Sequence, residues 1–310
     1  MTQSTALGPD GEFDAIRTLL DRWGARAVGI GDDAALVDVP RGDTLVLSVD
    51  SSVENRHFRR GWLTAREIGY KAVTAALSDL AAMAARPVGV LVALAIPDTW
   101  RSELLSIADG IGDALAAANT VIRGGNITAS TELSITTTVI GAAFEPLTRS
   151  GARAGDLVYV TGELGGPRAS LQRLEAGQEA GVHRDRLARP VARLEEARWL
   201  AEHGAQAAID ISDGLIGDLR HVAAASGVGI TLDAARIPRV AGVDIATAVV
   251  AGEEYELVVT TPAAFDTAAF ERRFALPLTE IGAVSAMRPN EVRVIGARVA
   301  DTSGHDHFSS

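Results

Sequence analysis

Apolar and polar residues in the first half of the chain follow two different spacings. Segments with apolar residues at helical spacing predict helices over residues 12–23, 64–84 and 101–118. Runs that are β-prone, alternating or almost wholly apolar predict strands over residues 44–49, 88–96 and 133–140, with a short apolar segment at 121–122. Residues 44–142 therefore predict the order strand, helix, strand, helix, strand, strand, which is an α/β domain with its helices on one side of a sheet.

The second of these predicted helices has a defined start and end. Thr64 and Glu67 stand three residues apart, which is typical of a capping box in which each side chain bonds the other residue's backbone N–H. Pro87 cannot continue a helix, so the chain is expected to leave the helix before that position.

A stretch rich in Gly, Pro, Ser and Arg at residues 141–155 is the best candidate domain boundary. Beyond it, the pattern predicts strands over residues 157–161, 207–209, 228–232, 254–260 and 278–284. Helices are predicted after Gly165-Gly166-Pro167, over 190–203, from Asp213 or Gly214, and near 262–274. The length of 310 residues suits two domains with full cores, which we place at 1–147 and 148–310.

Composition and charge exclude several classes of protein. A net charge of -11 argues against non-specific nucleic-acid binding, which needs basic surface. The chain has no cysteine, so disulfides, thiolate nucleophiles and Cys-ligated zinc or iron–sulfur clusters are excluded. Residues 1–11 lack the layout of a signal peptide, and no apolar run reaches membrane-spanning length. We therefore expect a cytoplasmic protein that binds neither nucleic acid nor membranes.

Acidic residues at the ends of apolar runs are the candidate chemistry. Asp32 and Asp33 follow a glycine pair, which permits a tight turn, and adjacent Asp residues are costly to desolvate without a cation. Similar acids recur at Asp50, Asp79, Asp210 and Asp213. An ordinary surface turn would explain any one of them. As a set, they predict a site where carboxylates converge on Mg²⁺ and a nucleotide phosphate.

Asp79 is the most informative of these acids because it lies in an otherwise apolar helix. Such an acid is costly unless it is paired, metal-bound or on an exposed stripe, and Lys71 is too far along the helix to pair with it locally. We prefer a metal ligand to a structural ion pair. Asp50 follows a predicted strand, where open α/β sheets place ligand groups, although an Asp-Ser turn is the alternative.

The remaining candidates lie on turns and at the boundary. Gly124-Gly125-Asn126 would let a backbone approach a phosphate, and a plain glycine turn is equally compatible. Arg149 would clamp a phosphate or else be a solvated linker residue. Asp210-Ile211-Ser212-Asp213-Gly214-Leu215 exceeds what an N-cap requires, and Gly252-Glu253-Glu254-Tyr255-Glu256-Leu257 is a second acidic turn before a strand. The sequence contains no phosphate-binding P-loop, dinucleotide fingerprint or nucleophile elbow.

Taken in order, these pieces resemble the thiamine-monophosphate kinase family, within the ATP-binding superfamily that includes aminoimidazole ribonucleotide synthetase. The matching segments are Gly11-Glu12-Phe13, Gly31-Asp32-Asp33-Ala34-Ala35, Asp50 with His57-Phe58, Leu77-Ser78-Asp79-Leu80-Ala81-Ala82-Met83, Gly124-Gly125, Arg149-Ser150-Gly151-Ala152, Asp210-Ile211-Ser212-Asp213-Gly214-Leu215, Gly252-Glu253 and Gly304-His305-Asp306-His307-Phe308. No single motif decides the resemblance, but the ordered set spans most of the chain.

The resemblance implies a two-domain α/β (α+β) fold of the aminoimidazole ribonucleotide synthetase type. Its ferredoxin-like N-terminal domain would bind ATP and Mg²⁺ and dimerise by joining sheets, and an α/β C-terminal domain would follow. The implied reaction is direct in-line phosphoryl transfer from ATP to thiamine monophosphate, which gives thiamine diphosphate without a catalytic base. Carried over by position, Mg²⁺ would be held by Asp33, Ser48, Asp50, Asp79, Asn126, Asp210 and Asp213, ATP by Gly125, Arg149 and Ser212, and the substrate by His57, Glu253 and His305.

The chain departs from the family pattern mainly on the substrate and first-metal side. Asn126 stands where the family has Asp, Val49 where it has Thr, and His305 where it has an aromatic residue that stacks on thiamine. Glu254 replaces the usual Asp. Two competing hypotheses follow: a nucleotide-binding paralogue with lost or altered acceptor specificity, and a superfamily kinase or synthetase with another phosphate-bearing acceptor.

Overall fold

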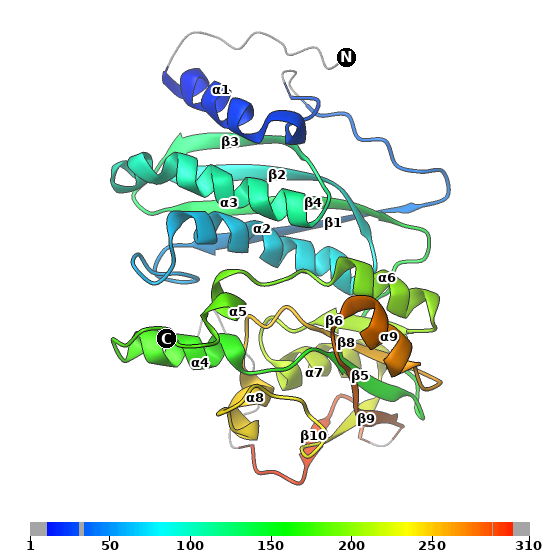
Figure 1. Cartoon of the computed structure of the whole chain (residues 1–310). Helices are drawn as coiled ribbons and strands as arrows, with labels where there is room; N and C mark the ends of the chain where they lie inside the picture. Colours follow the sequence, from blue (N-terminus) through cyan, green and yellow to red (C-terminus); the bar gives the residue numbers. More distant parts are fainter. Residues whose placement is uncertain (1–10, 31–33, 287, 300–310) are drawn as a thin grey trace. The chain divides into compact units, whose positions relative to one another are not determined.

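The computed structural model describes residues 11–30, 34–286 and 288–299, and the chain divides into two compact units (Figure 1). Unit 1 comprises Met1–Leu80 and Ala85–Glu145, and unit 2 comprises Ala81–Ala84 and Pro146–Ser310. Each unit has a sheet of its own. None of the described helices combines the length and the apolar character needed to cross a membrane.

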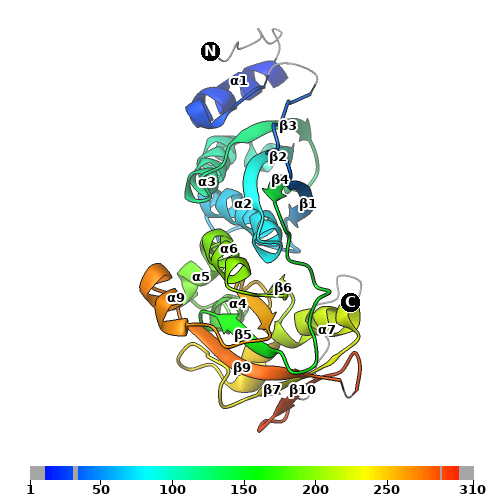
Figure 2. The ribbon, with the colours of Figure 1, turned by 90° about the vertical axis from the view of Figure 1, so that its right-hand side faces the viewer.

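The first half of the chain forms a four-stranded sheet with helices packed on one face (Figure 2). Its elements are α1 (Gly11–Trp23), the 3₁₀ helix η1 (Gly24–Arg26), β1 (Thr44–Val53), α2 (Ala65–Ala82), β2 (Arg86–Ile96), the 3₁₀ helix η2 (Asp98–Glu103), α3 (Leu104–Ala117), β3 (Ile122–Ala129) and β4 (Ser134–Ala143). The strand order is β1-β4-β2-β3, with only the β2–β3 pair parallel. The predicted order of strands and helices over residues 44–142 is therefore confirmed.

Glycines let the two long helices of unit 1 approach each other closely. A Cβ at Gly69 would lie 2.2 Å from the Ile107 carbonyl oxygen, and one at Gly110 would lie 1.8 Å from the Arg66 carbonyl oxygen. The start of α2 is fixed by the predicted capping box, because Thr64 N donates to Glu67 Oε2 at 2.8 Å and Glu67 N donates to Thr64 Oγ1 at 3.2 Å. The close approach at Gly69 and Gly110 packs α2 against α3 as one layer over the sheet.

Two local interpretations in unit 1 are wrong: the strand end at Asp50, and the alternative of a plain glycine turn at Gly124-Gly125-Asn126. Asp50 does not end a strand, because β1 continues through Ser51 and Ser52 to Val53, and its whole length pairs with β4. Gly124-Gly125-Asn126 is not a turn, because these residues lie inside β3 and pair with β2. In both places the backbone hydrogen bonds of neighbouring strands outweigh the local preference of Ser and Gly for turns.

The second half forms a six-stranded sheet of order β10-β7-β9-β5-β8-β6. Its elements are β5 (Leu157–Thr161), α4 (Gly166–Glu175), α5 (Arg184–Ala188), α6 (Leu194–Glu202), β6 (Ala207–Asp210), α7 (Leu215–Ser226), β7 (Gly229–Asp233), α8 (Ile245–Val250), β8 (Leu257–Thr261), α9 (Thr267–Phe274), β9 (Leu278–Ser285) and β10 (Val292–Ile295). Only β10 and β7 pair in parallel. The sequence missed the short elements α5, α8 and β10, which have too few residues to establish a period.

Helices cover both faces of this sheet. Val158 and Val160 of β5 belong to a core shared with α7 and α8. Tyr159, between them, points to the other face, where its ring lies 5.1 Å from that of Phe265. There Trp199 of α6 packs against Phe265 and against α9. The sheet therefore holds its strand ends and connecting turns on a rigid frame.

Candidate functional site

The first acidic turn of unit 2 lies between β6 and α7. Asp210 is the last residue of β6 and is buried, whereas Ser212 and Asp213 are half-buried on the turn. The N-cap of α7 is Gly214, which makes no side-chain cap. Its φ of +113° favours glycine, and a Cβ there would lie 2.8 Å from the Val250 carbonyl oxygen. Neither Ser212 nor Asp213 therefore caps the helix with its side chain.

The second acidic turn, residues 252–256, is hydrogen-bonded to the first through the backbone. Glu253 N donates to Ser212 O at 2.8 Å, and Tyr255 N donates to Ile211 O at 2.9 Å. In the reverse direction, Ile211 N donates to Glu256 O at 2.8 Å. The two turns therefore form one structure, which places the predicted metal and nucleotide residues of the first turn beside the predicted substrate residue of the second.

Asp218, in the first turns of α7, supports the first acidic turn. Its Oδ2 accepts hydrogen bonds from the backbone N–H groups of Ser212, Asp213 and Gly214, each at 3.1 Å. Its side chain is almost wholly buried. Burial, followed by the nearby carboxylates of Asp210 and Asp213, raises the pKa of Asp218 to about 8. The sequence analysis did not single out this residue.

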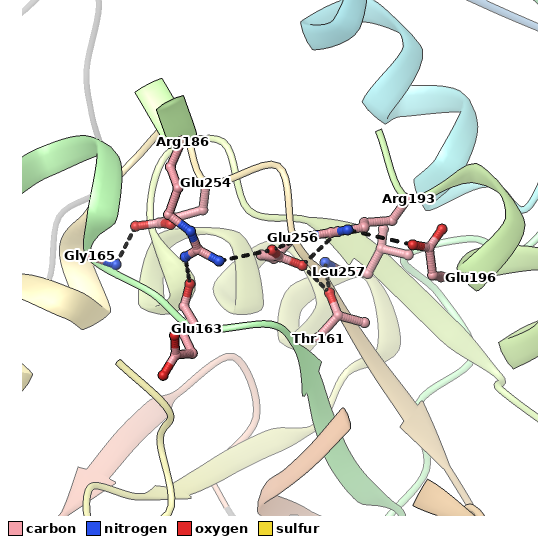
Figure 3. A network of polar contacts seen from close by, with 9 residues as sticks. All are labelled: Thr161, Glu163, Gly165, Arg186, Arg193, Glu196, Glu254, Glu256 and Leu257. Carbon is pink, nitrogen blue, oxygen red and sulfur yellow. Dashed lines mark hydrogen bonds and ion pairs between the residues drawn. The ribbon is translucent and has the colours of Figure 1, made fainter. Parts of the chain in front are cut away.

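A buried polar network anchors the second acidic turn (Figure 3). Glu256 accepts a bidentate pair of hydrogen bonds from Arg193, at 2.6 Å from Nη2 and 2.9 Å from Nε, and a third from Thr161 Oγ1 at 2.6 Å. Arg186 Nη2 lies 3.7 Å from the same carboxylate. Glu254 accepts from the backbone N–H of Gly165, and its burial raises its pKa to about 8.

Next to these anchors, at Glu253 and Tyr255, the backbone adopts an uncommon conformation. Glu253 has a φ of +62° and Tyr255 a φ of +53°, both in the left-handed region that non-glycine residues rarely adopt. Each such residue costs on the order of 1–3 kcal/mol and persists where surrounding contacts fix it. The backbone hydrogen bonds of Glu253 and Tyr255 to the first acidic turn supply those contacts, together with the anchored side chains of Glu254 and Glu256.

In unit 1, Ser48 and Asp79 come together. Ser48 Oγ on β1 donates to Asp79 Oδ2 on α2 at 2.5 Å, and Asp79 is only half-buried. Asp50 lies two residues beyond Ser48, so its side chain projects from the same face of β1, towards the α2 layer. Asp50 Oδ1 accepts from Ser51 N at 2.7 Å. Three of the predicted ligands therefore lie at the same face of the sheet: Ser48 and Asp50 on β1, and Asp79 on the helix α2 that packs there.

Strand register separates Gly125 from Asn126. Gly125 lies in a row with Val92, Thr137 and Asp50 across the sheet. Asn126 lies in the next row, and adjacent rows of a sheet point to opposite faces. Gly125 therefore shares the face of Asp50, whereas Asn126 is exposed on the opposite one. A Cβ at Gly125 would lie 2.0 Å from the Val92 carbonyl oxygen, which explains the glycine.

Hydrogen bonds fix the ring of His57 and the backbone of Arg149. The Nδ1 of His57 accepts from Val53 N at 3.1 Å, which places the proton of the neutral ring on Nε2. Arg149 is exposed, and its carbonyl oxygen accepts from Ser226 Oγ at 3.0 Å in unit 2. The same hydroxyl accepts from the N–H groups of Gly151 and Ala152. Ser226 therefore fixes the backbone on which Arg149 stands.

The predicted metal ligands that the structure describes divide between the two units. Asp33 and His305 lie outside the described residues. Across the part of the chain that the structure describes, no three His, Asp or Glu side chains stand ready to hold a metal ion. The remaining predicted ligands divide between the units: Ser48, Asp50, Asp79 and Asn126 in unit 1, and Asp210 and Asp213 in unit 2.

Comparison with known proteins identifies the family. Residues 31–143 match the AIR synthase related protein, N-terminal domain, and residues 153–295 match the corresponding C-terminal domain. Thiamine-monophosphate kinase of Salmonella typhimurium is 35% identical, with 97% of this chain and 99% of that protein covered. The chain belongs to the thiamine-monophosphate kinase family. The family resemblance and the two-domain AIR synthase-like fold predicted from sequence are thereby confirmed.

Solved structures of this kinase family share the fold. Thiamine-monophosphate kinase from Stenotrophomonas maltophilia has a TM-score of 0.82 at 32% identity, with 92% of this chain and 97% of that chain covered. AaThiL complexed with AMPPCP and TMP has a TM-score of 0.77 at 29% identity, with 98% of this chain and 100% of that chain covered. The likeness therefore extends through both units.

Sequence reasoning missed the residues that support the site. Asp218 lies inside a helix, where an acid at that position is typical of an ordinary first turn. Arg193 and Glu256 are 63 positions apart, and no local pattern connects them. The one available signal was the third acid of the turn, Glu256, because three acids in four residues exceed what a surface turn requires.

Proposed function

We propose that this protein transfers the terminal phosphoryl group of ATP to thiamine monophosphate, giving thiamine diphosphate. The observation that carries the proposal is the 35% identity to thiamine-monophosphate kinase of Salmonella typhimurium over nearly the whole of both chains. The AaThiL complex with AMPPCP and TMP supports ATP as the phosphoryl donor and thiamine monophosphate as the acceptor. The protein is then a phosphotransferase whose acceptor is itself a phosphate group.

Magnesium fits the residues of both units. The proposed ligands are carboxylate, hydroxyl and amide oxygens, which are the donors that Mg²⁺ prefers. In unit 2, burial and, after it, the carboxylates of Asp210 and Asp213 raise the pKa of Asp218, and a cation bound to those two carboxylates would offset the second effect. Ser48, Asp50 and Asp79 would hold Mg²⁺ in unit 1, and Asp210 and Asp213 in unit 2. Asp33 and Asn126 stay predictions from the sequence.

The remaining residues have binding rather than proton-transfer roles. Bound Mg²⁺ would neutralise the triphosphate and the developing charge of an in-line displacement. Three residues would contact the nucleotide. Gly125 would do so through its backbone, Arg149 through its planar guanidinium and Ser212 through its hydroxyl. His57 and Glu253 would contact the thiamine phosphate, and His305 stays a prediction for the same substrate. The attacking phosphate is already an anion, so the reaction requires no general base.

We also propose that the protein is a homodimer. β1 is an edge strand of the unit 1 sheet, and Leu45, Leu47 and Val49 are 48%, 60% and 63% exposed on the face of the sheet opposite α2. An exposed apolar edge strand favours pairing with another chain, and a second copy of this chain carries the same strand. A cytoplasmic location stays a prediction from the sequence.

The test is a direct assay with purified protein, ATP, Mg²⁺ and thiamine monophosphate. Chromatography should detect thiamine diphosphate and ADP in equal amounts, and chelation of Mg²⁺ should abolish both. Protein that binds ATP but yields no thiamine diphosphate would refute the proposed activity.

That negative result would leave two competing hypotheses: a paralogue with lost or altered acceptor specificity, and a superfamily enzyme with another phosphate-bearing acceptor. Turnover restored by Asn126→Asp would indicate a paralogue with a lost metal charge. Stabilisation by another phosphorylated metabolite in a thermal-shift screen would instead indicate a different acceptor.

A further inference from the structure

The turn that carries Ser212 and Asp213 has an unusual source of support. Its three consecutive N–H groups, from Ser212 to Gly214, all point to one oxygen, Oδ2 of Asp218, at 3.1 Å each. A capping residue ordinarily precedes its helix, whereas this carboxyl lies inside the helix and reaches back over the N-cap. The three donors fix the direction of three successive peptide planes, and therefore the direction of the side chains between them.

The other contacts of the turn do not replace this one. Ser212 O is occupied by Glu253 N, and Asp218 N donates to Gly214 O at 2.9 Å. The close approach of Gly214 to the Val250 backbone sets the position of one end of the turn but leaves its N–H direction open. Without an acceptor at Asp218 Oδ2, three backbone donors would be left unsatisfied in a largely buried place, which proteins avoid.

We propose that Asp218 is a positioning residue for the metal site of unit 2: it holds the turn so that Asp210 and Asp213 present their carboxylates to Mg²⁺ and Ser212 its hydroxyl to the nucleotide. The inference rests on the proposed function for the identity of the ligands. Asp218 itself does not contact the metal ion. It acts through the backbone, so what it supplies is an acceptor oxygen at one place rather than a charge.

This distinction gives two variants with opposite expectations. Asp218→Asn keeps an oxygen of the same shape that can accept the three N–H groups but removes the carboxylate. Asp218→Ala removes the acceptor. We expect Asp218→Ala to weaken divalent-cation binding by about 10–100-fold, the usual effect of losing an outer partner of a metal site, and Asp218→Asn to stay within about threefold of the wild type.

The measurement is Mn²⁺ binding by electron paramagnetic resonance, in the presence of a non-hydrolysable ATP analogue. The matched control is Asp156→Ala, because Asp156 is also buried and its Oδ2 accepts from a backbone N–H, that of Arg153 at 2.8 Å. Both alanine variants should lower the melting temperature, but only Asp218→Ala should lower Mn²⁺ affinity. A purely structural role would make the two alanine variants alike in Mn²⁺ binding.

Two results of the Mn²⁺-binding measurement would overturn the proposed role of Asp218. Equal loss of Mn²⁺ binding in Asp218→Asn and Asp218→Ala would overturn it, because charge or direct ligation would then matter. Unchanged Mn²⁺ binding in Asp218→Ala would overturn it as well.

If Asp218→Ala does not fold, amide hydrogen exchange in the wild type provides the test. The amides of residues 212–214 should be protected in the metal-free protein, and rapid exchange there would refute the inference. Failure of the proposed function would give a different result: wild-type protein would bind Mn²⁺ and nucleotide but would form no thiamine diphosphate in the activity assay.

Discussion

Glu254 shows how a single buried acid ties the stability of this protein to pH. Burial raises its pKa to about 8 from an ordinary value of 4.5, and its Oε1 accepts a hydrogen bond from the N–H of Gly165. Because the folded state holds the proton more tightly than the unfolded chain, the contribution of Glu254 to stability is fully present below about pH 4.5. It is lost as the pH rises towards 8.

Glu254→Gln should therefore stabilise the protein at high pH and not at low pH. The amide keeps an oxygen for the Gly165 N–H and never ionises. We expect the free energy of unfolding of the variant to exceed that of the wild type by about 1 kcal/mol or more at pH 8.5, and to be close to it at pH 4.5. Urea unfolding at both pH values measures this. Glu271→Gln, exposed on α9, is the control and should match the wild type at both.

Ser48 tests the proposed magnesium ligands of unit 1 at the same scale. Ser48→Ala removes the hydroxyl that donates to Asp79 Oδ2 at 2.5 Å, so the carboxylate loses a partner that orients it. We expect the Mg²⁺ concentration for half-maximal rate to rise about tenfold. The control is Ser51→Ala on the same strand, whose hydroxyl pairs with Thr136 on the opposite face. An equal shift in both variants would contradict a specific role for Ser48.

At the level of elements, the sequence predicted what local patterns determine. The capping box of Thr64 and Glu67 and the strand–helix order of unit 1 follow from nearest neighbours along the chain. The strand limits at Asp50 and Gly125 did not, because pairing with β4 and β2 decided them. The same holds for the candidate site: its acids were visible in sequence, but the hydrogen bonds that join the two acidic turns are not a sequence property.

The Arg193–Glu256 pair is the element-scale link whose removal should be most costly. The two side chains are 14% and 3% exposed, and Arg193 joins the start of α6 to the start of β8. Arg193→Met leaves a buried carboxylate without its bidentate partner, which we expect to cost about 3–5 kcal/mol in urea unfolding. Arg198→Met, which breaks the more exposed Arg198–Glu195 pair, should cost under about 1 kcal/mol. A similar cost in both variants would contradict the anchoring role.

For the whole molecule, we expect the open face of the unit 1 sheet to determine the oligomeric state. Leu45, Leu47 and Val49 alternate along the edge strand β1 with residues that face α2, so these three of its ten side chains present apolar surface to solvent. Acids, bulges or a covering helix ordinarily blunt such an edge, and β1 shows none of these over Thr44–Val49 in the described structure. A second copy of the chain would cover the same surface symmetrically.

Leu47→Glu should therefore convert a dimer into a monomer without unfolding it, because a dimer would bury this charge at its own counterpart across a two-fold axis. Light scattering coupled to size exclusion should give about twice the chain mass for the wild type and about the chain mass for the variant at micromolar concentration. Val182→Glu is the matched control, since Val182 is 92% exposed in unit 2 and should leave the dimer intact. A wild-type protein that scatters as a monomer, or a Leu47→Glu protein that stays dimeric, would show that β1 is not the contact.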